Sequence, residues 1–144
     1  MNNTFILLVD DEEPFVATMS KRLDKRGLKV ISANSGQEAL EQLAKNMTVD
    51  VIILDVKMPG MDGIETLQEI KKYHPLKEVI MLTGHATVES AIEGMKQGAF
   101  DYLMKPCDID ALLSKVDEAV KKKQAHEQKI DQARIDKIVK TRGY

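Results

Sequence analysis

The chain has 144 residues, of which 43% are hydrophobic and 31% are charged, a composition typical of one soluble globular domain. It has no run of 18 apolar residues and no basic and apolar leader, so we expect neither a membrane-spanning helix nor a signal peptide. Cys107 is the single cysteine, which excludes an internal disulfide bond. These features favour a cytoplasmic protein that does not bind membranes.

Charge is distributed unevenly along the chain. The formal net charge is −2, but residues 1–120 carry −7 and residues 121–144 carry +5. The basic tail is either the solvated end of a helix or a contact for an acidic partner or nucleic acid. Tryptophan is absent and aromatic residues make up only 4%, so few side chains could stack on nucleic-acid bases. We therefore expect no direct nucleic-acid binding by this chain.

Five short apolar runs each end near a turn or a polar cluster, which indicates β-strands. They span residues 5–9, 28–31, 51–54, 79–82 and 102–104. The first, third and fourth runs are continuously apolar and do not alternate. This pattern is typical of strands that are buried on both faces of a parallel sheet.

Five stretches with a helical spacing of apolar residues follow these runs. They are centred on residues 14–26, 36–46, 64–70, 88–95 and 112–120. Ser35 and Glu38 form a potential capping box for the second helix. The alternation of strands and helices predicts an α/β domain with a parallel sheet, helices on both faces and a ligand crevice at the carboxyl ends of the strands.

Distinctive polar residues follow four of the five strands. Asp10 and Asp11 follow the first strand, Asp55 the third, Thr83 the fourth and Lys105 the fifth. Taken singly, each has an ordinary explanation as a turn, cap or loop residue. A parallel sheet brings all of them to one edge, however, and this coincidence indicates a functional site.

Three clustered carboxylates repel one another, and a divalent cation removes that repulsion. Oxygen ligands in an open pocket suit Mg²⁺, with two carboxylates and a carbonyl from the loop after Asp55 as the protein's share. A free oxygen of Asp55 would then act as a nucleophile and form an acyl phosphate. Mg²⁺ and Lys105 would neutralise the developing charge, and Thr83 would donate its hydroxyl to a phosphoryl oxygen.

In these segments the sequence resembles the response-regulator receiver family of two-component systems. The matching segments are LVDDE (8–12), LDVKMPGMDG (54–63), LTG (82–84) and YLMKP (102–106), and the resemblance covers about residues 4–122. It implies a flavodoxin-like, doubly wound (βα)5 fold with five parallel strands in the order 2-1-3-4-5. We expect a receiver domain at residues 1–122 and a basic helical extension or linker at residues 123–144.

The resemblance also implies roles for the acidic residues. Asp55 would be the phosphoacceptor, and a histidine kinase or phosphotransfer protein would be the donor. Asp11, Asp55 and the backbone carbonyl of Lys57 would bind Mg²⁺, while Asp10 would act through water. Beyond accepting and losing the phosphoryl group, the chain would not be an enzyme.

A second group of residues would transmit the signal. Thr83 and Lys105 would hold the phosphoryl group, and the peptide bond before Pro106 would be cis. Thr83 and Tyr102 would be the switch pair, which changes the face formed by the fourth helix, the fifth strand and the fifth helix. That face would control a partner or an output, and a homodimer through it is one implied assembly.

Two variable positions are expected to set the lifetime of the phosphorylated state. In the family, the residues two positions after the phosphoacceptor and two after the threonine tune loss of the phosphoryl group, and here they are Lys57 and His85. We hypothesise that both side chains crowd the attacking water. The alternative is that they are an ordinary surface lysine and a histidine at a helix start.

Several alternatives are compatible with parts of the pattern. The chain could be a receiver fragment of a longer transcriptional regulator, with the tail as a linker or dimerising helix, or a degenerate receiver that acts as a binding module. A phosphatase with an aspartyl nucleophile usually has an Asp-x-Asp pair after the first strand, which Asp10-Asp11-Glu12 lacks. A flavin carrier is disfavoured by the few aromatic residues and the acidic first loop.

Overall fold

The computed structural model describes residues 3–141 and shows one parallel sheet in the order β2-β1-β3-β4-β5. Its strands are β1 (Phe5–Val9), β2 (Lys29–Ala33), β3 (Val51–Leu54), β4 (Glu78–Thr83) and β5 (Asp101–Met104). The helices are α1 (Glu13–Lys25), α2 (Gly36–Lys45), α3 (Gly63–Tyr73), α4 (Val88–Lys96) and α5 (Ile109–Thr141). The expected fold class and strand order are confirmed.

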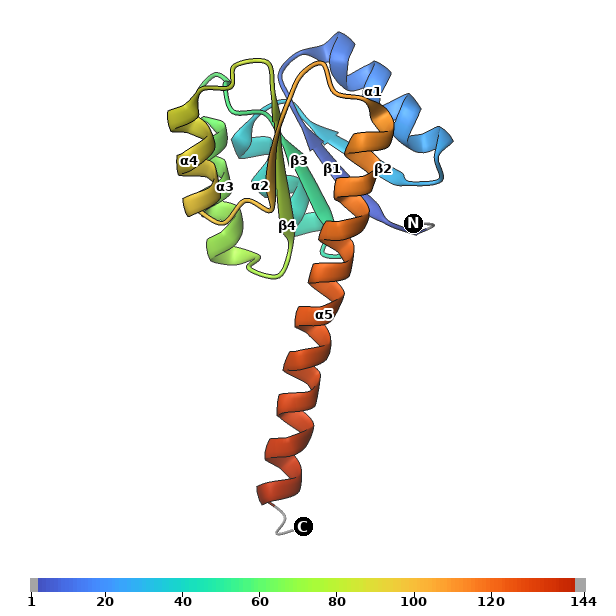
Figure 1. Cartoon of the computed structure of the whole chain (residues 1–144), viewed down its shortest axis with the longest axis vertical. Coiled ribbons are helices and arrows are strands. Elements are labelled where there is room, and N and C mark those ends of the chain that lie inside the picture. Colours follow the sequence, from blue (N-terminus) through green and yellow to red (C-terminus); the bar gives the residue numbers. More distant parts are fainter. Residues whose placement is uncertain (1–2, 142–144) are drawn as a thin grey trace.

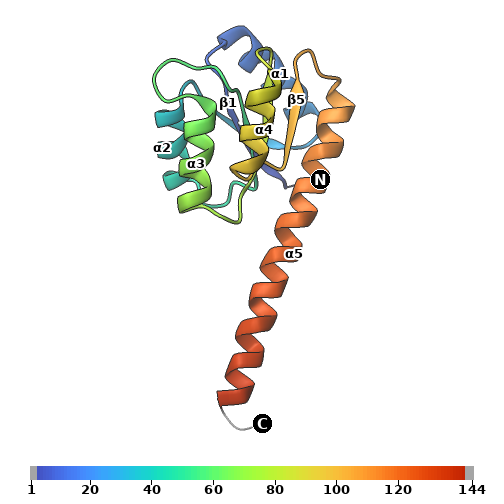
Figure 2. The ribbon, with the colours of Figure 1, turned by 60° about the vertical axis from the view of Figure 1, so that its left-hand side comes forward.

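Helices cover both faces of the sheet, as Figures 1 and 2 show. α1 and α5 lie on one face, where the core includes Leu23, Val116 and Ile53. α2, α3 and α4 lie on the other face, where the core includes Leu43, Leu67 and Ile52. The alternation of side chains along each strand therefore divides its apolar residues between two clusters.

The central strands are apolar because both of their faces are covered. Every residue of β1, β3 and β4 is buried, as their continuous apolar runs predicted. The edge strands β2 and β5 contain exposed residues, Lys29 and Met104. This burial explains why the pattern of β1, β3 and β4 is more distinctive than that of the two edges.

Five strand boundaries differ from the prediction by one or two residues: the starts of β2, β4 and β5 and the ends of β2 and β4. β2 starts one residue late, because Leu28 still belongs to the turn that Gly27 makes at φ 86°, with the Leu28 amide bonded to the Leu23 carbonyl. β4 starts one residue early, at Glu78, whose side chain is only 1% exposed. A strand that begins on a buried carboxylate is invisible to a search for apolar runs.

The predicted cap of α2 is confirmed in part. The Glu38 amide donates to Ser35 Oγ at 3.1 Å. In a full capping box the Glu38 carboxylate would accept from the Ser35 amide. Instead Glu38 Oε2 accepts from the amide of Asn34 at 3.0 Å, one residue earlier.

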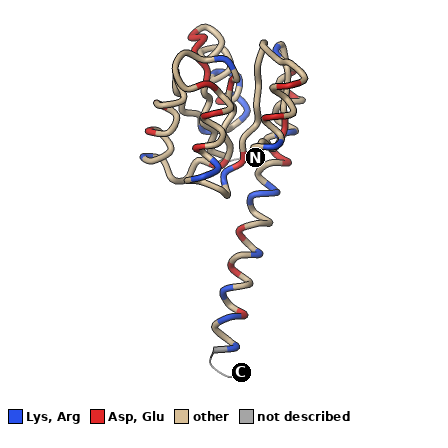
Figure 3. The backbone as a smooth tube through the Cα atoms, turned by 90° about the vertical axis from the view of Figure 1, so that its left-hand side faces the viewer, with Lys and Arg blue, Asp and Glu red and all other residues tan. Residues whose placement is uncertain are grey.

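α5 has 33 residues and extends far beyond the sheet (Figure 1). Its first part is held by buried Leu112, Leu113, Val116 and Ala119, whereas every residue from 128 to 140 is exposed. The extension is not a separate or irregular segment: α5 continues as one helix through Thr141. Figure 3 shows basic and acidic residues mixed along this extension.

Charged residues join the start of this extension to the amino-terminal end of the sheet. Lys122 Nζ lies 3.4 Å from Glu78 Oε2, and Lys123 Nζ lies 3.4 Å from Asp50 Oδ1. Lys71 Nζ lies 3.6 Å from the second oxygen of Glu78. Two of the tail's basic residues thus meet acidic residues of the body, so part of the charge asymmetry in the sequence is internal pairing.

This sheet-base cluster consists of Asp50, Lys71, Lys77, Glu78, Lys122 and Lys123, and burial affects the pKa values of Lys77 and Lys123. Burial lowers the pKa of Lys77, and the nearby charge of Lys123 lowers it further. The ammonium of Lys77 donates to the carbonyls of Met47 and Val49, each at 2.6 Å. Burial also opposes the charge of Lys123, but its bonds to Glu127 and Asp50 raise the pKa above the ordinary value.

Among the described residues, no helix combines the length and the apolar character that crossing a bilayer demands.

We predict that Lys123→Met loosens the α5 extension. The substitution keeps the length of the side chain but removes the pair with Glu127 of the same helix and the link to Asp50, and the latter is worth about 1 kcal/mol for a partly buried pair. Hydrogen exchange at α5 amides beyond residue 123 should then become about fivefold faster. Lys121→Met is the matched control, because Lys121 pairs with Asp117 of the same helix; equal effects of the two substitutions would contradict the prediction.

Candidate functional site

The acidic residues predicted from the strand ends do meet at one edge of the sheet. Asp10 follows β1 and Asp55 follows β3, and their side chains are 1% and 2% exposed. Asp11, the next residue after Asp10, is exposed. One carboxylate oxygen from each of the three lies within 4.8 Å of the others. The register that pairs Val9 with Leu54 places the two strand ends side by side and creates this cluster.

Local hydrogen bonds fix the two buried carboxylates. Asp10 Oδ1 accepts from the amide of Glu12 at 2.9 Å, and Asp55 Oδ1 accepts from the amide of Val56 at 2.8 Å. In each case the second oxygen faces the ammonium of Lys105. Each carboxylate therefore keeps one oxygen for its own loop and turns the other toward the site.

Lys105 connects the cluster to the fifth strand. Its ammonium lies 2.7 Å from Asp10 Oδ2, 3.3 Å from Glu12 Oε1 and 4.0 Å from Asp55 Oδ2. It also lies 4.0 Å from the centroid of the Phe15 ring, within the range of a cation–π contact. The sequence analysis missed Glu12 and Phe15 as contacts of this lysine, because contacts between residues so far apart in the chain leave no local pattern.

The pKa values of Asp10 and Lys105 are both raised above their ordinary values. Burial raises the pKa of Asp10, and the charge of Asp55 adds to this, while the bonds from Lys105 and the Glu12 amide oppose it. Burial lowers the pKa of Lys105, but its bond to Asp10 and the charges of Asp10 and Asp55 raise it above the ordinary value. One ammonium thus partly compensates a buried acidic pair.

Thr83 and Tyr102 lie on the neighbouring strands. Thr83 ends β4 and is fully buried, and its Oγ1 accepts from the amide of His85 at 3.1 Å. Its carbonyl accepts from the amide of Lys105 at 2.9 Å, which joins the ends of β4 and β5. Tyr102 is half-buried in β5, and its hydroxyl lies 2.7 Å from Ser90 Oγ. The Lys105–Pro106 peptide bond is cis.

The loop after Asp55 is held tightly against the site. The amide of Gly63 donates to the carbonyl of Val56 at 2.7 Å. A Cβ on Gly63 would lie 2.2 Å from the carbonyl oxygen of Asp55, so this position requires glycine. The sequence does not reveal this requirement, because a close backbone approach leaves no periodic signal.

Lys57 and His85 line one cavity together with Val56, the residue that follows Asp55. Both residues are exposed, and the cavity measures about 390 Å³. Its other lining residues are Met58, Asp62, Ala86 and Thr87. The two positions singled out by the resemblance therefore share one space between the loops that follow β3 and β4.

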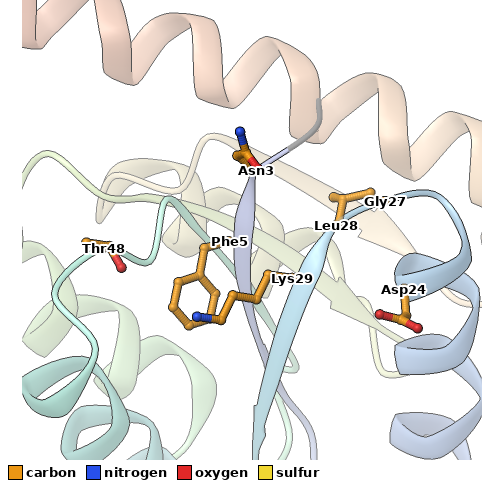
Figure 4. A pocket seen from close by; sticks show the side chains of 7 residues that line it. All are labelled: Asn3, Phe5, Asp24, Gly27, Leu28, Lys29 and Thr48. Atoms are coloured by element: carbon orange, nitrogen blue, oxygen red, sulfur yellow. The ribbon is translucent and has the colours of Figure 1, made fainter.

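A larger cavity of about 500 Å³ lies at the opposite end of the sheet (Figure 4). Phe5 and Lys29, the first residues of β1 and β2, line it together with Asn3, Asp24, Gly27, Leu28 and Thr48. Lys29 Nζ lies 4.4 Å from the centroid of the Phe5 ring. This cavity lies at the amino-terminal edge of the sheet and shares no lining residue with the acidic cluster.

The chemistry of this edge fits a hard divalent cation. Three carboxylates gather here, two of them face Lys105, and all potential ligands are oxygen atoms. The exposed Asp11 opens the cluster to solvent. Such a site can bind a cation and a phosphoryl group together, since the cation offsets the negative charge of both.

Comparison with known proteins settles which family has this arrangement. The family model for the response regulator receiver domain matches residues 6–117. This chain belongs to the response regulator receiver family. A receiver domain protein of known structure from Clostridium thermocellum is 38% identical, with a TM-score of 0.81 over 85% of this chain and 98% of that one.

Curated relatives of this receiver are much longer proteins. The DNA-binding transcriptional regulator NtrC of Escherichia coli K12 is 38% identical over 128 residues, which are 89% of this chain and 27% of the relative. The transcriptional regulatory protein ZraR of the same strain is 41% identical over 130 residues, or 90% and 28%. The chain thus spans about a quarter of the length of these relatives.

We predict that Asp55→Asn stabilises the fold in metal-free buffer. Asp55 has two carboxylates and one ammonium around it, so its neutralisation relieves net repulsion by about 1 kcal/mol. Thermal unfolding should show Tm raised by about 3 °C. Asp24→Asn, an exposed substitution far from the cluster, should leave Tm unchanged; a lower Tm for Asp55→Asn would show that attraction to Lys105 dominates.

Proposed function

We propose that Asp55 is the phosphoacceptor of this receiver and that it takes its phosphoryl group from a histidine kinase or a phosphotransfer protein. The observation that carries the proposal is the position of Asp55 Oδ2, 4.0 Å from Lys105 Nζ within the acidic cluster. Asp55 is buried, and its other oxygen is bonded to the Val56 amide, so one oxygen remains for the reaction.

The carboxylate cluster is the proposed Mg²⁺ site. Asp11 and Asp55, with the backbone carbonyl of Lys57, would be ligands, and Asp10 would act through a water molecule. Bound Mg²⁺ supplies positive charge next to the transferred phosphoryl group. The exposure of Asp11 and the cavity that Lys57 lines leave room for the water ligands that Mg²⁺ keeps.

Side chains of the receiver perform the remaining steps. One oxygen of Asp55 attacks phosphorus as the bond to the donor breaks, and an acyl phosphate forms. Lys105, already held by Asp10, binds a phosphoryl oxygen and offsets its charge. Thr83 turns its hydroxyl toward another phosphoryl oxygen and donates a hydrogen bond to it. The movement of Thr83 in turn moves the loop after β4. Hydrolysis of the acyl phosphate returns the free carboxylate, so the only enzymatic activity is self-directed.

The proposed output surface is the face formed by α4, β5 and α5. Val88, Ile92 and Met95 of α4 and Met104 of β5 are exposed large apolar residues. Phosphorylation would change this face through Thr83 and Tyr102. The phosphoryl group adds a charge of about −2, which would shift the loop after β4 between its two arrangements. A homodimer or a partner protein would bind there.

A role within a longer transcriptional regulator is the second candidate. The chain matches about a quarter of NtrC, a DNA-binding transcriptional regulator, and of ZraR, a transcriptional regulatory protein. In that case α5 beyond residue 122 would be a linker from the receiver to an output domain.

We predict a single phosphoryl adduct on this chain after incubation with acetyl phosphate and Mg²⁺, measured as intact mass. Asp55→Asn should take no adduct, because an amide is not a nucleophile toward phosphorus, and a chelator should abolish the adduct in the wild type. Asp24→Asn should behave as the wild type. An adduct that persists in Asp55→Asn would identify another acceptor, and an absence of adduct under kinase as well as acetyl phosphate would favour a degenerate receiver.

We also predict that Lys57→Ala and His85→Ala shorten the lifetime of the phosphorylated state by several fold. Both side chains line one cavity with Val56, the residue that follows Asp55, so their removal opens the path of the attacking water. Loss of the adduct with time after removal of the donor measures the rate. Lys57→Met separates bulk from charge, since it fills the cavity without an ammonium; unchanged rates in both alanine variants would sink the hypothesis.

A further inference from the structure

The first turn of α4 carries a complete capping box that includes Ser90. The Ser90 amide donates to Thr87 Oγ1 at 3.0 Å, and the Thr87 amide donates to Ser90 Oγ at 3.0 Å. The Ser90 hydroxyl also donates to the Thr87 carbonyl at 3.1 Å. These bonds satisfy backbone groups that a helix start otherwise leaves without partners.

The same Ser90 hydroxyl reaches the fifth strand. Its oxygen lies 2.7 Å from the hydroxyl oxygen of Tyr102, twelve residues further along the chain. A serine hydroxyl has one proton and two acceptor positions. The Thr87 amide and the Thr87 hydroxyl each donate to Ser90 Oγ at 3.0 Å, and the Tyr102 hydroxyl oxygen lies 2.7 Å from it. The Tyr102 contact is the shortest of these, and it is the one that joins Ser90 to another element of the fold.

The ring of Tyr102 rests on the same side of α4. A Cβ on Gly94 would lie 3.5 Å from Cδ2 of Tyr102, so the ring passes close to this position. Ser90 and Gly94 are four residues apart and share one face of the helix. The ring thus covers one turn of α4, from Gly94 back to Ser90, and packs against the core under α2 and α3.

We propose that Ser90 is the positioning residue of Tyr102. Its hydroxyl holds the tyrosine against the first turn of α4 in the unphosphorylated chain, and any rotation of Tyr102 must break this bond. The cap of α4 and the position of Tyr102 are therefore coupled. The inference rests on the proposed function, in which Thr83 and Tyr102 form the switch, and it adds a residue of α4 that sets the balance between the two states.

The coupling gives Ser90 a direct effect on phosphoryl binding. Loss of the Ser90–Tyr102 bond removes an interaction found in the unphosphorylated state, so the phosphorylated arrangement becomes easier to reach. A hydrogen bond of this kind shifts such an equilibrium by about fivefold. A residue that touches neither Asp55 nor the phosphoryl group would thus tune the affinity of the site.

A double-mutant cycle tests the proposal with beryllium fluoride as a phosphoryl mimic in excess Mg²⁺. The apparent affinity is measured by NMR titration for the wild type, Ser90→Ala, Tyr102→Phe and the double variant. We expect Ser90→Ala to raise the affinity about fivefold in the wild-type background and to leave it nearly unchanged in the Tyr102→Phe background. Thr87→Ala is the matched control, because it removes the bonds of the Thr87 hydroxyl to the amide and the hydroxyl of Ser90 but leaves both partners of the Ser90–Tyr102 bond in place, and its effect should be equal in both backgrounds.

The outcomes separate the inference from the proposed function. An equal effect of Ser90→Ala in both backgrounds means that Ser90 acts only as a cap and overturns the inference, while normal binding by the wild type keeps the proposed function. Failure of the wild type to bind beryllium fluoride contradicts the proposed function. Amide exchange in the first turn of α4 needs no phosphoryl group: Tyr102→Phe should accelerate it by a few fold, and unchanged exchange overturns the Ser90–Tyr102 coupling.

Discussion

The rest of the site depends on one constraint, the convergence of buried carboxylates at the carboxyl edge of a parallel sheet. Adjacent strands end side by side, so Asp10 and Asp55 meet although 45 residues separate them in the sequence. Their burial makes charge costly, and one lysine from a third strand offsets that cost in part. The position of Lys105, the protonation of Asp10 and the fit for a divalent cation all follow from this placement.

Features that recur along the chain, such as apolar runs and polar residues at strand ends, could be predicted from the sequence. Individual contacts between distant residues could not. Continuous apolar runs identified the central strands, and polar residues at four strand ends identified the site. Glu78 at the start of β4 was missed because a buried carboxylate looks like an exposed one in a sequence. Ser90 was missed because its partner Tyr102 lies on another element, and the steric need for Gly63 depends on a backbone approach that only the fold reveals.

The two ends of the sheet handle buried charge in opposite ways. At the carboxyl end the acidic groups outnumber the basic ones, so the arrangement is electrostatically incomplete without a further cation. At the amino end Glu78 lies near both Lys71 and Lys122, and Lys77 is bonded to two carbonyls. In the sheet-base cluster four lysines meet two carboxylates, Asp50 and Glu78, so the two ends of the sheet carry charge imbalances of opposite sign.

Because α5 is long, small changes at the sheet-base cluster would produce large movements at the end of the helix. At about 1.5 Å per residue, the part of the helix beyond residue 122 projects roughly 30 Å from the body. A tilt of about 10° at its root would therefore move its tip by about 5 Å, close to the height of one helical turn. Lys122 and Lys123 lie where the helix leaves the body. The pairs that they make with Glu78 and Asp50 therefore set the direction of the extension.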